Sequence, residues 1–207
     1  GGGGTRTRLP TDRGRRIDLL VWLGVSVLLF ATVRLNYPSP FHETDTDTYL
    51  RAAQKLVYNP YRPPGYSAFL SLVHHVGPGL RFIFTAQFVL HAVSVLLLYL
   101  TAMRFYRPGR PAVFRLMFLL LLGLPSLLYC TNYLMSDSLF VSLTLLWTTA
   151  ILWCLSTARW PWILLSALLS YAALQVRYAG FVYPAVAALV LGMLLPGWRR
   201  RGLAVMI

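Results

Sequence analysis

The chain has 207 residues, of which 57% are hydrophobic and 12% are charged, and its mean hydropathy is +0.60. This composition excludes an ordinary soluble domain and is typical of a polytopic membrane protein. The formal net charge of +13 does not indicate a nucleic-acid partner, because the basic residues fall in short segments between apolar runs, as membrane topology requires. We therefore expect an all-α membrane protein.

The first segment, residues 1–16, begins with four glycines and contains five arginines. We interpret it as a flexible, basic, cytoplasmic leader. Residues 17–207 are expected to form one transmembrane domain. The apolar residues 203–207 resemble the start of a further apolar run, so we expect this chain to be the front part of a longer protein.

Six apolar runs are long enough to cross about 30 Å of hydrocarbon as helices. They cover residues 17–35, 80–103, 116–133, 139–155, 160–176 and 181–195. The leader, two of the loops and the segment after the sixth run carry thirteen of the basic residues. The excess of positive charge on that side predicts a cytoplasmic amino terminus in the cell (inner) membrane, with the loop 36–79 on the extracytoplasmic face.

The outer loop, residues 36–79, is the longest polar segment. Its apolar residues recur at helical spacing over residues 48–58, which predicts an amphipathic helix lying on the membrane surface. Pro60, Pro63, Pro64 and Gly65 then end that helix. A second helix is expected over residues 66–76.

Three of the six acidic residues of the chain, Glu43, Asp45 and Asp47, lie just before the first loop helix. Asp47 suits a helix start and an i, i+4 ladder with Arg51 and Lys55, so a cap and a catalytic role stay open for it. Asp45 has no obvious local cation, which makes it the stronger candidate for a general base or metal ligand. Glu43 and His42 could assist. Both aspartates could hold Mg²⁺ or Mn²⁺ together with a substrate phosphate.

Cations on the same side could bind an anionic lipid headgroup, since guanidinium groups match phosphate in a bidentate way. The candidates are Arg51, Lys55, Arg62, Arg81 and Arg177. For Lys55 and Arg81, contact with ordinary acidic membrane lipid is the simpler interpretation. Arg177 interrupts an apolar stretch, where an unpaired charge is costly and a functional partner is expected. Asp137 begins the fourth run, as either a helix cap or a substrate contact.

Several segments together resemble the GT-C glycosyltransferases, polytopic enzymes that use polyprenyl-phosphate-linked sugars. They are Asp45-Thr46-Asp47-Thr48-Tyr49, Ala52-Ala53, Arg62-Pro63-Pro64-Gly65-Tyr66, Met135-Ser136-Asp137-Ser138-Leu139-Phe140 and Val176-Arg177-Tyr178-Ala179-Gly180. The last two are similar to segments of the mannosyltransferase and aminoarabinose-transferase branches. The branch with an acidic pair has adjacent Asp-Glu, whereas here Thr46 follows Asp45.

The resemblance implies a glycosyltransferase in which Asp45 serves as base or metal contact, with Asp47 and Glu43 as further members of the catalytic set. Arg62 and Arg177 would hold the donor phosphate, and Tyr49, Lys55 and Asp137 would complete the substrate site. The acceptor is not indicated. The competing interpretation is a non-enzymatic membrane protein, such as a lipid-headgroup transporter or an assembly subunit, that docks through the outer loop. Transporters commonly carry ionisable residues at mid-span, and the expected span centres are almost free of them.

Overall fold

The computed structural model describes residues 12–39, 41, 43, 45–55, 61–77, 79–106 and 108–194, and these residues form helices and no β-strand. In chain order the elements are α1 (Asp12–Asn36), α2 (Thr46–Lys55), α3 (Gly65–Val76), α4 (Leu80–Tyr106), α5 (Pro111–Leu122), α6 (Pro125–Thr131), α7 (Ser136–Thr157), α8 (Trp160–Val176), the 3₁₀ helix η1 (Tyr178–Phe181) and α9 (Val182–Leu194).

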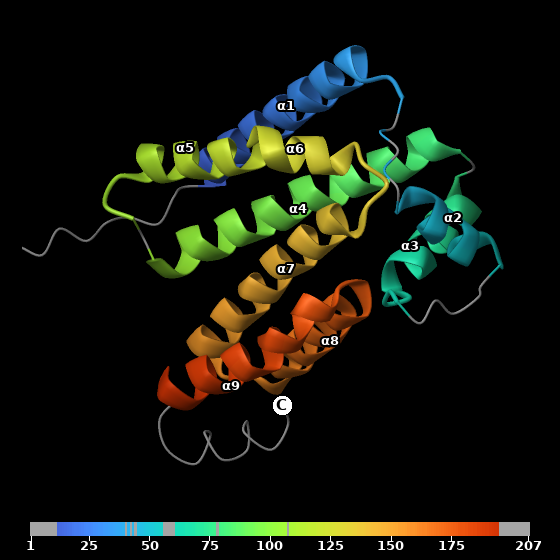
Figure 1. The fold of residues 1–207 in the computed structure, drawn as a ribbon. Helices are drawn as coiled ribbons and strands as arrows, with labels where there is room; N and C mark the ends of the chain where they lie inside the picture. The colour runs from blue at the N-terminus through green and yellow to red at the C-terminus, as the bar shows by residue number, and fades with distance from the viewer. Residues whose placement is uncertain are drawn as a thin grey trace, which may run out of the picture.

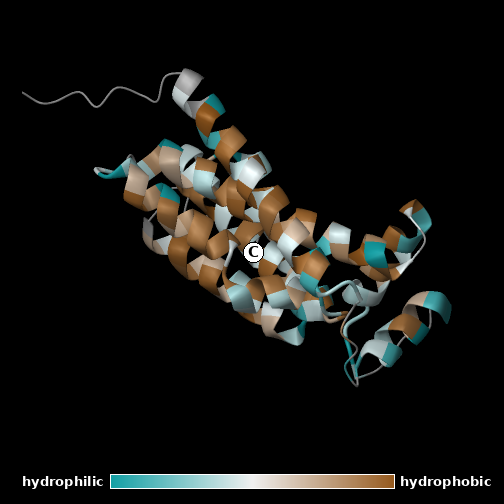
Figure 2. Cartoon of the chain, turned by 90° about the horizontal axis from the view of Figure 1, so that it is seen from above, coloured by the Kyte–Doolittle hydropathy of each residue, from teal (hydrophilic) through white to brown (hydrophobic). Residues whose placement is uncertain are grey.

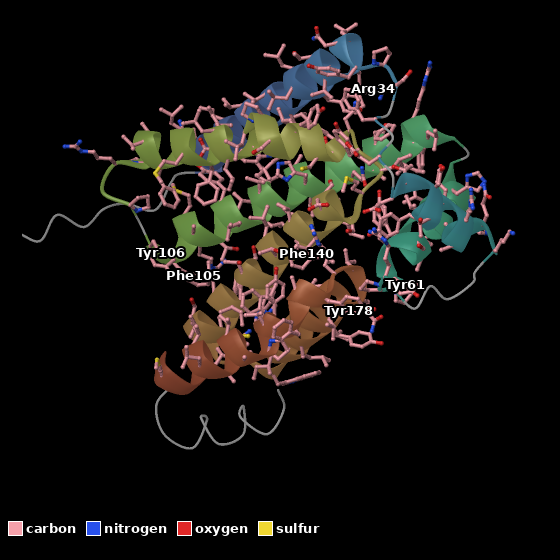
Figure 3. All side chains as sticks on the ribbon, in the orientation of Figure 1. Arg34, Tyr61, Phe105, Tyr106, Phe140 and Tyr178 are labelled. Carbon is pink, nitrogen blue, oxygen red and sulfur yellow. The ribbon has the colours of Figure 1, made fainter. Side chains whose placement is uncertain are left out.

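The long helices run back and forth beside one another, and α2 and α3 lie together beyond one end of the bundle (Figure 1). We call this end, where α1, α6 and α8 finish and α4, α7 and α9 begin, the loop end. The other end, where α4 and α7 finish and α5 and α8 begin, is the basic end. Figure 3 shows Arg34, Tyr61 and Tyr178 toward the loop end and Phe105 and Tyr106 toward the basic end.

In the part of the chain that the structure describes, three helices are long and apolar enough to cross a membrane, namely Arg16–Asn36 within α1, α4 and α7. The helices α5 and α6 would make a fourth crossing if they form one span, with a bend of 41° between them. Apolar residues cover these helices, and hydrophilic ones gather at their ends and in the loops (Figure 2). The chain is therefore a helical membrane protein whose described residues hold three to four candidate spans, while α8 and the segment Tyr178–Met193 are apolar but shorter.

The third expected span, residues 116–133, is not one continuous helix. The helix α5 ends at Leu122, Gly123 follows it, and α6 begins with Pro125. Proline has no amide hydrogen to continue the preceding helix and its ring clashes with the previous turn, so the axis bends there.

The two helices of the outer loop were predicted at nearly the observed positions. The second, expected over residues 66–76, is α3 at Gly65–Val76. The first, expected over residues 48–58, is α2 at Thr46–Lys55. Residues 56–60 lie outside the described part of the chain.

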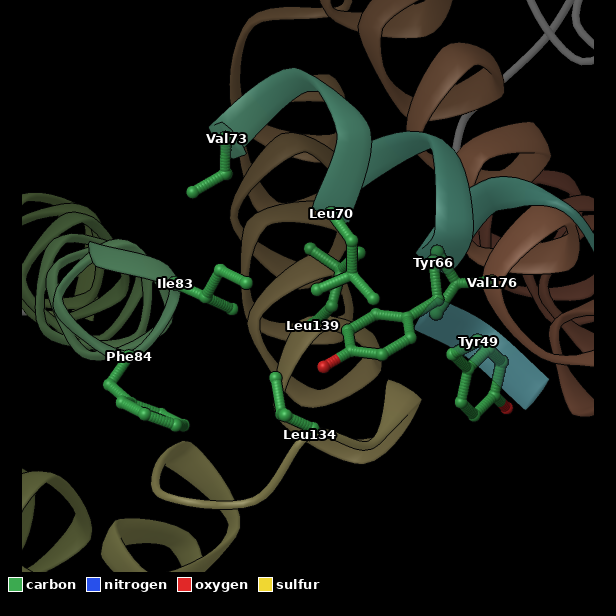
Figure 4. Close-up of a cluster of buried hydrophobic side chains, with 9 residues drawn as sticks. All are labelled: Tyr49, Tyr66, Leu70, Val73, Ile83, Phe84, Leu134, Leu139 and Val176. Atoms are coloured by element: carbon green, nitrogen blue, oxygen red, sulfur yellow. The ribbon is translucent and has the colours of Figure 1, made fainter. Parts of the chain in front are cut away.

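A buried cluster joins the outer loop to the bundle (Figure 4). It consists of Tyr49, Tyr66, Leu70, Val73, Ile83, Phe84, Leu134, Leu139 and Val176. These side chains come from α2, α3, α4, α7, α8 and the segment before α7. Burying each large side chain contributes about 1.5–3 kcal/mol relative to exposure, so this cluster fixes α2 and α3 against the ends of the long helices.

Two glycines let the backbone approach the end of α8 closely. A Cβ atom on Gly65 would lie 2.5 Å from the carbonyl oxygen of Gln175, and one on Gly180 would lie 2.4 Å from the amide nitrogen of Leu174. Both glycines therefore seat their segments on the last turns of α8, beside Arg177.

Candidate functional site

An ion pair joins the two halves of the outer loop. Asp45 lies directly before α2, and Arg62 lies in the turn before α3. Arg62 Nη2 lies 2.5 Å from Asp45 Oδ1. The expectation that Asp45 has no local cation is therefore wrong, because the turn that ends at Pro63 and Pro64 folds the second half of the loop back onto the first.

The guanidinium of Arg62 also contacts Tyr49, donating from Nη1 to the phenol oxygen at 3.0 Å. The Arg62 Cζ atom lies 5.1 Å from the centroid of the Tyr49 ring. Partial burial lowers the pKa of Arg62, but the hydrogen bonds to Asp45 and Tyr49 outweigh burial and leave that pKa above its ordinary value. Arg62 is thus a fixed positive charge.

Tyr49 links the loop to the bundle. Its side chain is 4% exposed, and its hydroxyl donates to Ser136 Oγ at 3.2 Å, in the first turn of α7. Its ring meets Tyr66 edge-on, with the centroids 4.8 Å apart. The burial favours a positioning role for Tyr49 over the predicted contact with substrate, because the hydroxyl that could meet a ligand is engaged by Arg62 and Ser136.

The start of α2 is held by Thr46, which is fully buried. The Thr46 amide donates to the Glu43 carbonyl at 2.9 Å, and the Glu43 amide donates to Thr46 Oγ1 at 2.9 Å. Thr46 Oγ1 in turn donates to the carbonyl of Leu134, before α7, at 3.4 Å. These bonds satisfy backbone groups that a helix start leaves free, and they fix the position of Asp45.

A second buried layer supports the first. The Tyr66 hydroxyl donates to Gln87 Oε1 at 2.8 Å, and Gln87 Nε2 donates to the carbonyls of Thr131 and Tyr133 at 2.9 and 3.0 Å. Burial raises the pKa of Tyr66 well above its ordinary value, and the charges of Tyr49 and Asp137 add to the effect. The Tyr66 hydroxyl therefore remains a protonated donor.

A second ion pair lies at the same end of the bundle. Arg177, directly after α8, contacts Asp137 in the first turn of α7 through Nη1 and Oδ1, and its Cζ atom lies 5.8 Å from the centroid of the Phe140 ring. No side chain caps the start of α7. Asp137 therefore does not act as the helix cap, one of the two roles left open for it. Its carboxylate is the partner of Arg177.

The other predicted site residues lie on the surface. Asp47 is in the first turn of α2 and exposed, Lys55 ends that helix, and the Glu43 side chain is also exposed. The predicted ladder of Asp47, Arg51 and Lys55 forms no ion pair in the described residues, consistent with the small gain from exposed pairs. His42 lies outside the described part of the chain.

Sequence reasoning missed three polar residues that the structure places at or near this site. Ser136 and Gln87 hold the two tyrosines, and His91 lies one turn after Gln87 in α4 with 1% exposure and no hydrogen-bond partner for Nε2 within the described residues. A glutamine and a histidine four residues apart inside an apolar run were the available signal. Sequence reasoning gave them too little weight in judging the span centres nearly free of ionisable groups.

The site therefore contains two ion pairs at the loop end, Asp45 with Arg62 and Asp137 with Arg177. Buried hydrogen bonds of Tyr49 and Tyr66 lie beneath them. An anion with one or more phosphate oxygens is the ligand that two guanidinium groups at a water boundary recognise best. Comparisons of the chain with known protein families, with curated proteins and with solved structures find no match.

Proposed function

We propose that the chain transfers a sugar from a polyprenyl-phosphate-linked donor to an acceptor at the loop end, as a GT-C-type glycosyltransferase. One observation carries this proposal. The segments that resemble that family, far apart in the sequence, meet at one end of the bundle: Asp45 contacts Arg62, Tyr49 contacts Ser136, and Asp137 contacts Arg177.

The proposal gives Arg62 two partners in turn. Its pair with Asp45 is about one-third exposed on each side chain, and pairs of that kind contribute about 0–1 kcal/mol. A donor phosphate can therefore displace Asp45 from Arg62 at small cost. Once displaced, the carboxylate of Asp45 is available to accept a proton beside the bound donor.

The chemistry then follows from the charges. Asp45 accepts the proton of the acceptor hydroxyl while the acceptor oxygen bonds to the anomeric carbon of the sugar. The bond from that carbon to the phosphate oxygen breaks, and the polyprenyl phosphate leaves with the electron pair. The phosphate gains one negative charge in this step, so Arg62 binds it more strongly as the bond breaks, which accelerates the reaction. Arg177 is the second cation for the donor.

The proposed reaction assigns the positive charge beside Asp45 to Arg62 and not to a divalent cation. Asp45, the strongest candidate ligand, already contacts a cation of the protein itself through Oδ1. No step of the proposed reaction requires a metal.

The transfer reaction can be tested with two matched variants in membranes that contain the chain, supplied with a polyprenyl-phosphate-linked sugar. Asp45→Asn should lower sugar transfer by a factor of about 100 or more, the usual effect of losing a general base, with unchanged protein abundance. Asp47→Asn, in the same loop and exposed, is the control and should retain most of the transfer. Equal transfer by both variants would refute the role of Asp45.

We also propose six crossings, with α8 and the segment Tyr178–Met193 as short spans, the amino terminus in the cytoplasm and the loop end outside. Successive proposed spans run in opposite directions between the basic end and the loop end (Figure 1), which supports an even number of crossings. A cysteine in place of the exposed Asp47, in a chain whose Cys130 is replaced by serine, should react with a membrane-impermeant maleimide in intact cells. Labelling only after the cells are opened would place the loop end in the cytosol and overturn this orientation.

A transporter or docking subunit is the competing function, and the buried His91 in α4 is the observation that favours it. His91→Leu separates the two functions. Sugar transfer should survive this change if the loop end is the active site, whereas a function based on a polar path through the membrane should be lost.

A further inference from the structure

The basic end of the bundle contains a groove that the proposed reaction does not use. It lies between α4, α7 and α8 and has a volume of about 360 Å³, which falls in the range of ligand pockets, about 300–1,000 Å³. Most of its lining is aliphatic, including Leu97, Leu100, Leu165 and Leu169. An unbranched hydrocarbon chain matches such a lining.

One charged side chain stands in the lining of this groove. Arg104, in the last turn of α4, lines it together with Thr101, Trp153 and Trp162. Its guanidinium lies over the Trp153 ring, with Cζ 5.0 Å from the centroid. No carboxylate of the described residues forms an ion pair with Arg104, so its charge is held in place by an aromatic face and is free to meet an anion.

The aromatic support of Arg104 is itself fixed. Trp153 Nε1 donates to Thr101 Oγ1 at 3.0 Å. The Trp162 ring stacks on Trp153 with centroids 4.7 Å apart, and Phe105 meets Trp153 edge-on at 4.9 Å. Trp153 lies near the end of α7 and Trp162 near the start of α8, and tryptophans at span ends are typical of the boundary between the hydrocarbon and the headgroups, where a lipid phosphate would lie.

The charge of this end complements an acidic headgroup. Arginines flank the helix ends here, with Arg110 before α5 and Arg159 before α8, whereas the carboxylate of Asp18 at this end is engaged by Arg115 and Tyr99. Basic pockets between transmembrane helices bind acidic lipid headgroups. A zwitterionic lipid would bind less strongly than an acidic one, because the positive charge of its headgroup is repelled by these arginines.

We propose that this groove is a specific site for one acidic phospholipid of the adjoining leaflet, with its phosphate on Arg104 and one acyl chain between α4 and α8. The Thr101 hydroxyl, which accepts from Trp153, supplies its own proton to a lipid oxygen. The site is independent of the sugar-transfer reaction at the loop end.

The test is the lipid that stays bound when the chain is purified in mild detergent after equilibration with vesicles of equal parts phosphatidylglycerol and phosphatidylcholine. Bound lipid is identified by mass spectrometry. Arg104→Gln should lower the ratio of acidic to zwitterionic lipid about fivefold, the effect of about one arginine at a membrane surface. Arg110→Gln, exposed at the same end and outside the groove, is the control and should leave the ratio nearly unchanged.

A second variant tests the groove without changing charge. Leu165→Trp places a larger side chain at the partly exposed rim of the groove and should reduce the retention of phosphatidylglycerol. An unchanged ratio in Arg104→Gln together with unchanged retention in Leu165→Trp would overturn the proposal. An equal fall in Arg104→Gln and Arg110→Gln would also overturn it, because the effect would then belong to the general charge of this end.

Discussion

The two ends of the bundle contain the same three kinds of side chain in different settings. At the basic end, Arg115 contacts Asp18 at 2.5 Å, and the Tyr99 hydroxyl donates to Asp18 at 2.9 Å. At the loop end, Arg62 contacts Asp45 at the same distance and Tyr49 through its hydroxyl. The Asp18 side chain is 10% exposed and joins α1, α4 and α5, whereas that of Asp45 is 36% exposed and lies directly before the short helix α2.

This difference shows that residue types alone do not distinguish a structural contact from a functional site. Asp18, in α1, contacts Tyr99 of α4 and Arg115 of α5, so moving it would remove a contact shared by three helices. Asp45 can leave Arg62 by a side-chain rotation at the water boundary, because its backbone is fixed independently through Thr46 and Leu134. Of these two pairs, the one at the loop end has the more exposed carboxylate, and it is the pair that we propose a ligand opens.

The largest expected effect concerns how the loop end is seated on the bundle. Gly65→Ala would place a methyl group 2.5 Å from the Gln175 carbonyl oxygen. Because that contact is with backbone, the free energy of unfolding should fall by about 3 kcal/mol. Gly24→Ala, in α1 with nothing within 4 Å of the added atom, is the control and should be neutral or slightly stabilising. Thermal unfolding in detergent compares them, and equal midpoints would show that α3 is not seated through Gly65.

The next effect compares the two acids directly. Asp18→Ala should lower the free energy of unfolding by about 2 kcal/mol, since it removes the partner of Arg115 and the acceptor of Tyr99 at a mostly buried point. Asp45→Ala should cost less than about 1 kcal/mol, because its pair is more exposed. Denaturant or thermal unfolding of both variants checks the order. The reverse order would mean that Asp45 is the structural contact.

A smaller expected effect is the pH dependence of the stability that the buried Tyr66 hydroxyl contributes at the loop end. Burial raises the pKa of Tyr66 above the usual value near 10, so the folded state keeps this proton where the unfolded state loses it. The contribution is complete below about pH 10 and falls as the pH rises above that value. Tyr66→Phe should lose about 1 kcal/mol at neutral pH and show a shallower decline between pH 9 and about 11. Parallel unfolding midpoints over that range would contradict this role.

No effect is expected from removing metal ions. Sugar transfer by membranes treated with a chelator should remain within the scatter of untreated samples, because Arg62 supplies the positive charge at Asp45. A large loss that is restored by Mg²⁺ or Mn²⁺ would show that a cation replaces Arg62 in the active arrangement.

Sequence reasoning predicted the features that depend on local pattern. The position of α3 follows from Pro63, Pro64 and Gly65 before an apolar run, and α2 follows from its amphipathic spacing. The long apolar helices between basic segments were predicted from the hydropathy of the sequence. The bend before α6 could have been predicted from Pro125, but the continuous apolar composition around this proline favoured a single straight span.

Contacts between distant segments could not be predicted in this way. The partner of Asp45 depends on how the turn before α3 folds back, and the partner of Arg177 depends on α8 ending at the level where α7 begins. Exposed charges on α2 suggested a ladder, but long side chains in water lose more freedom than such pairs return. The buried support of Tyr66 on Gln87 required knowing which face of α4 meets α3.

The most direct test of the loop end is equilibrium binding of a short-chain polyprenyl phosphate to the purified chain. If Arg62 is shared between Asp45 and the donor phosphate, Arg62→Gln should weaken binding at least about tenfold, as expected for a lost charge-assisted hydrogen bond. Asp45→Asn should instead tighten binding up to about fivefold by releasing Arg62, and Arg115→Gln at the basic end should leave it unchanged. Unchanged binding in Arg62→Gln, or weaker binding in Asp45→Asn, would contradict the proposed exchange.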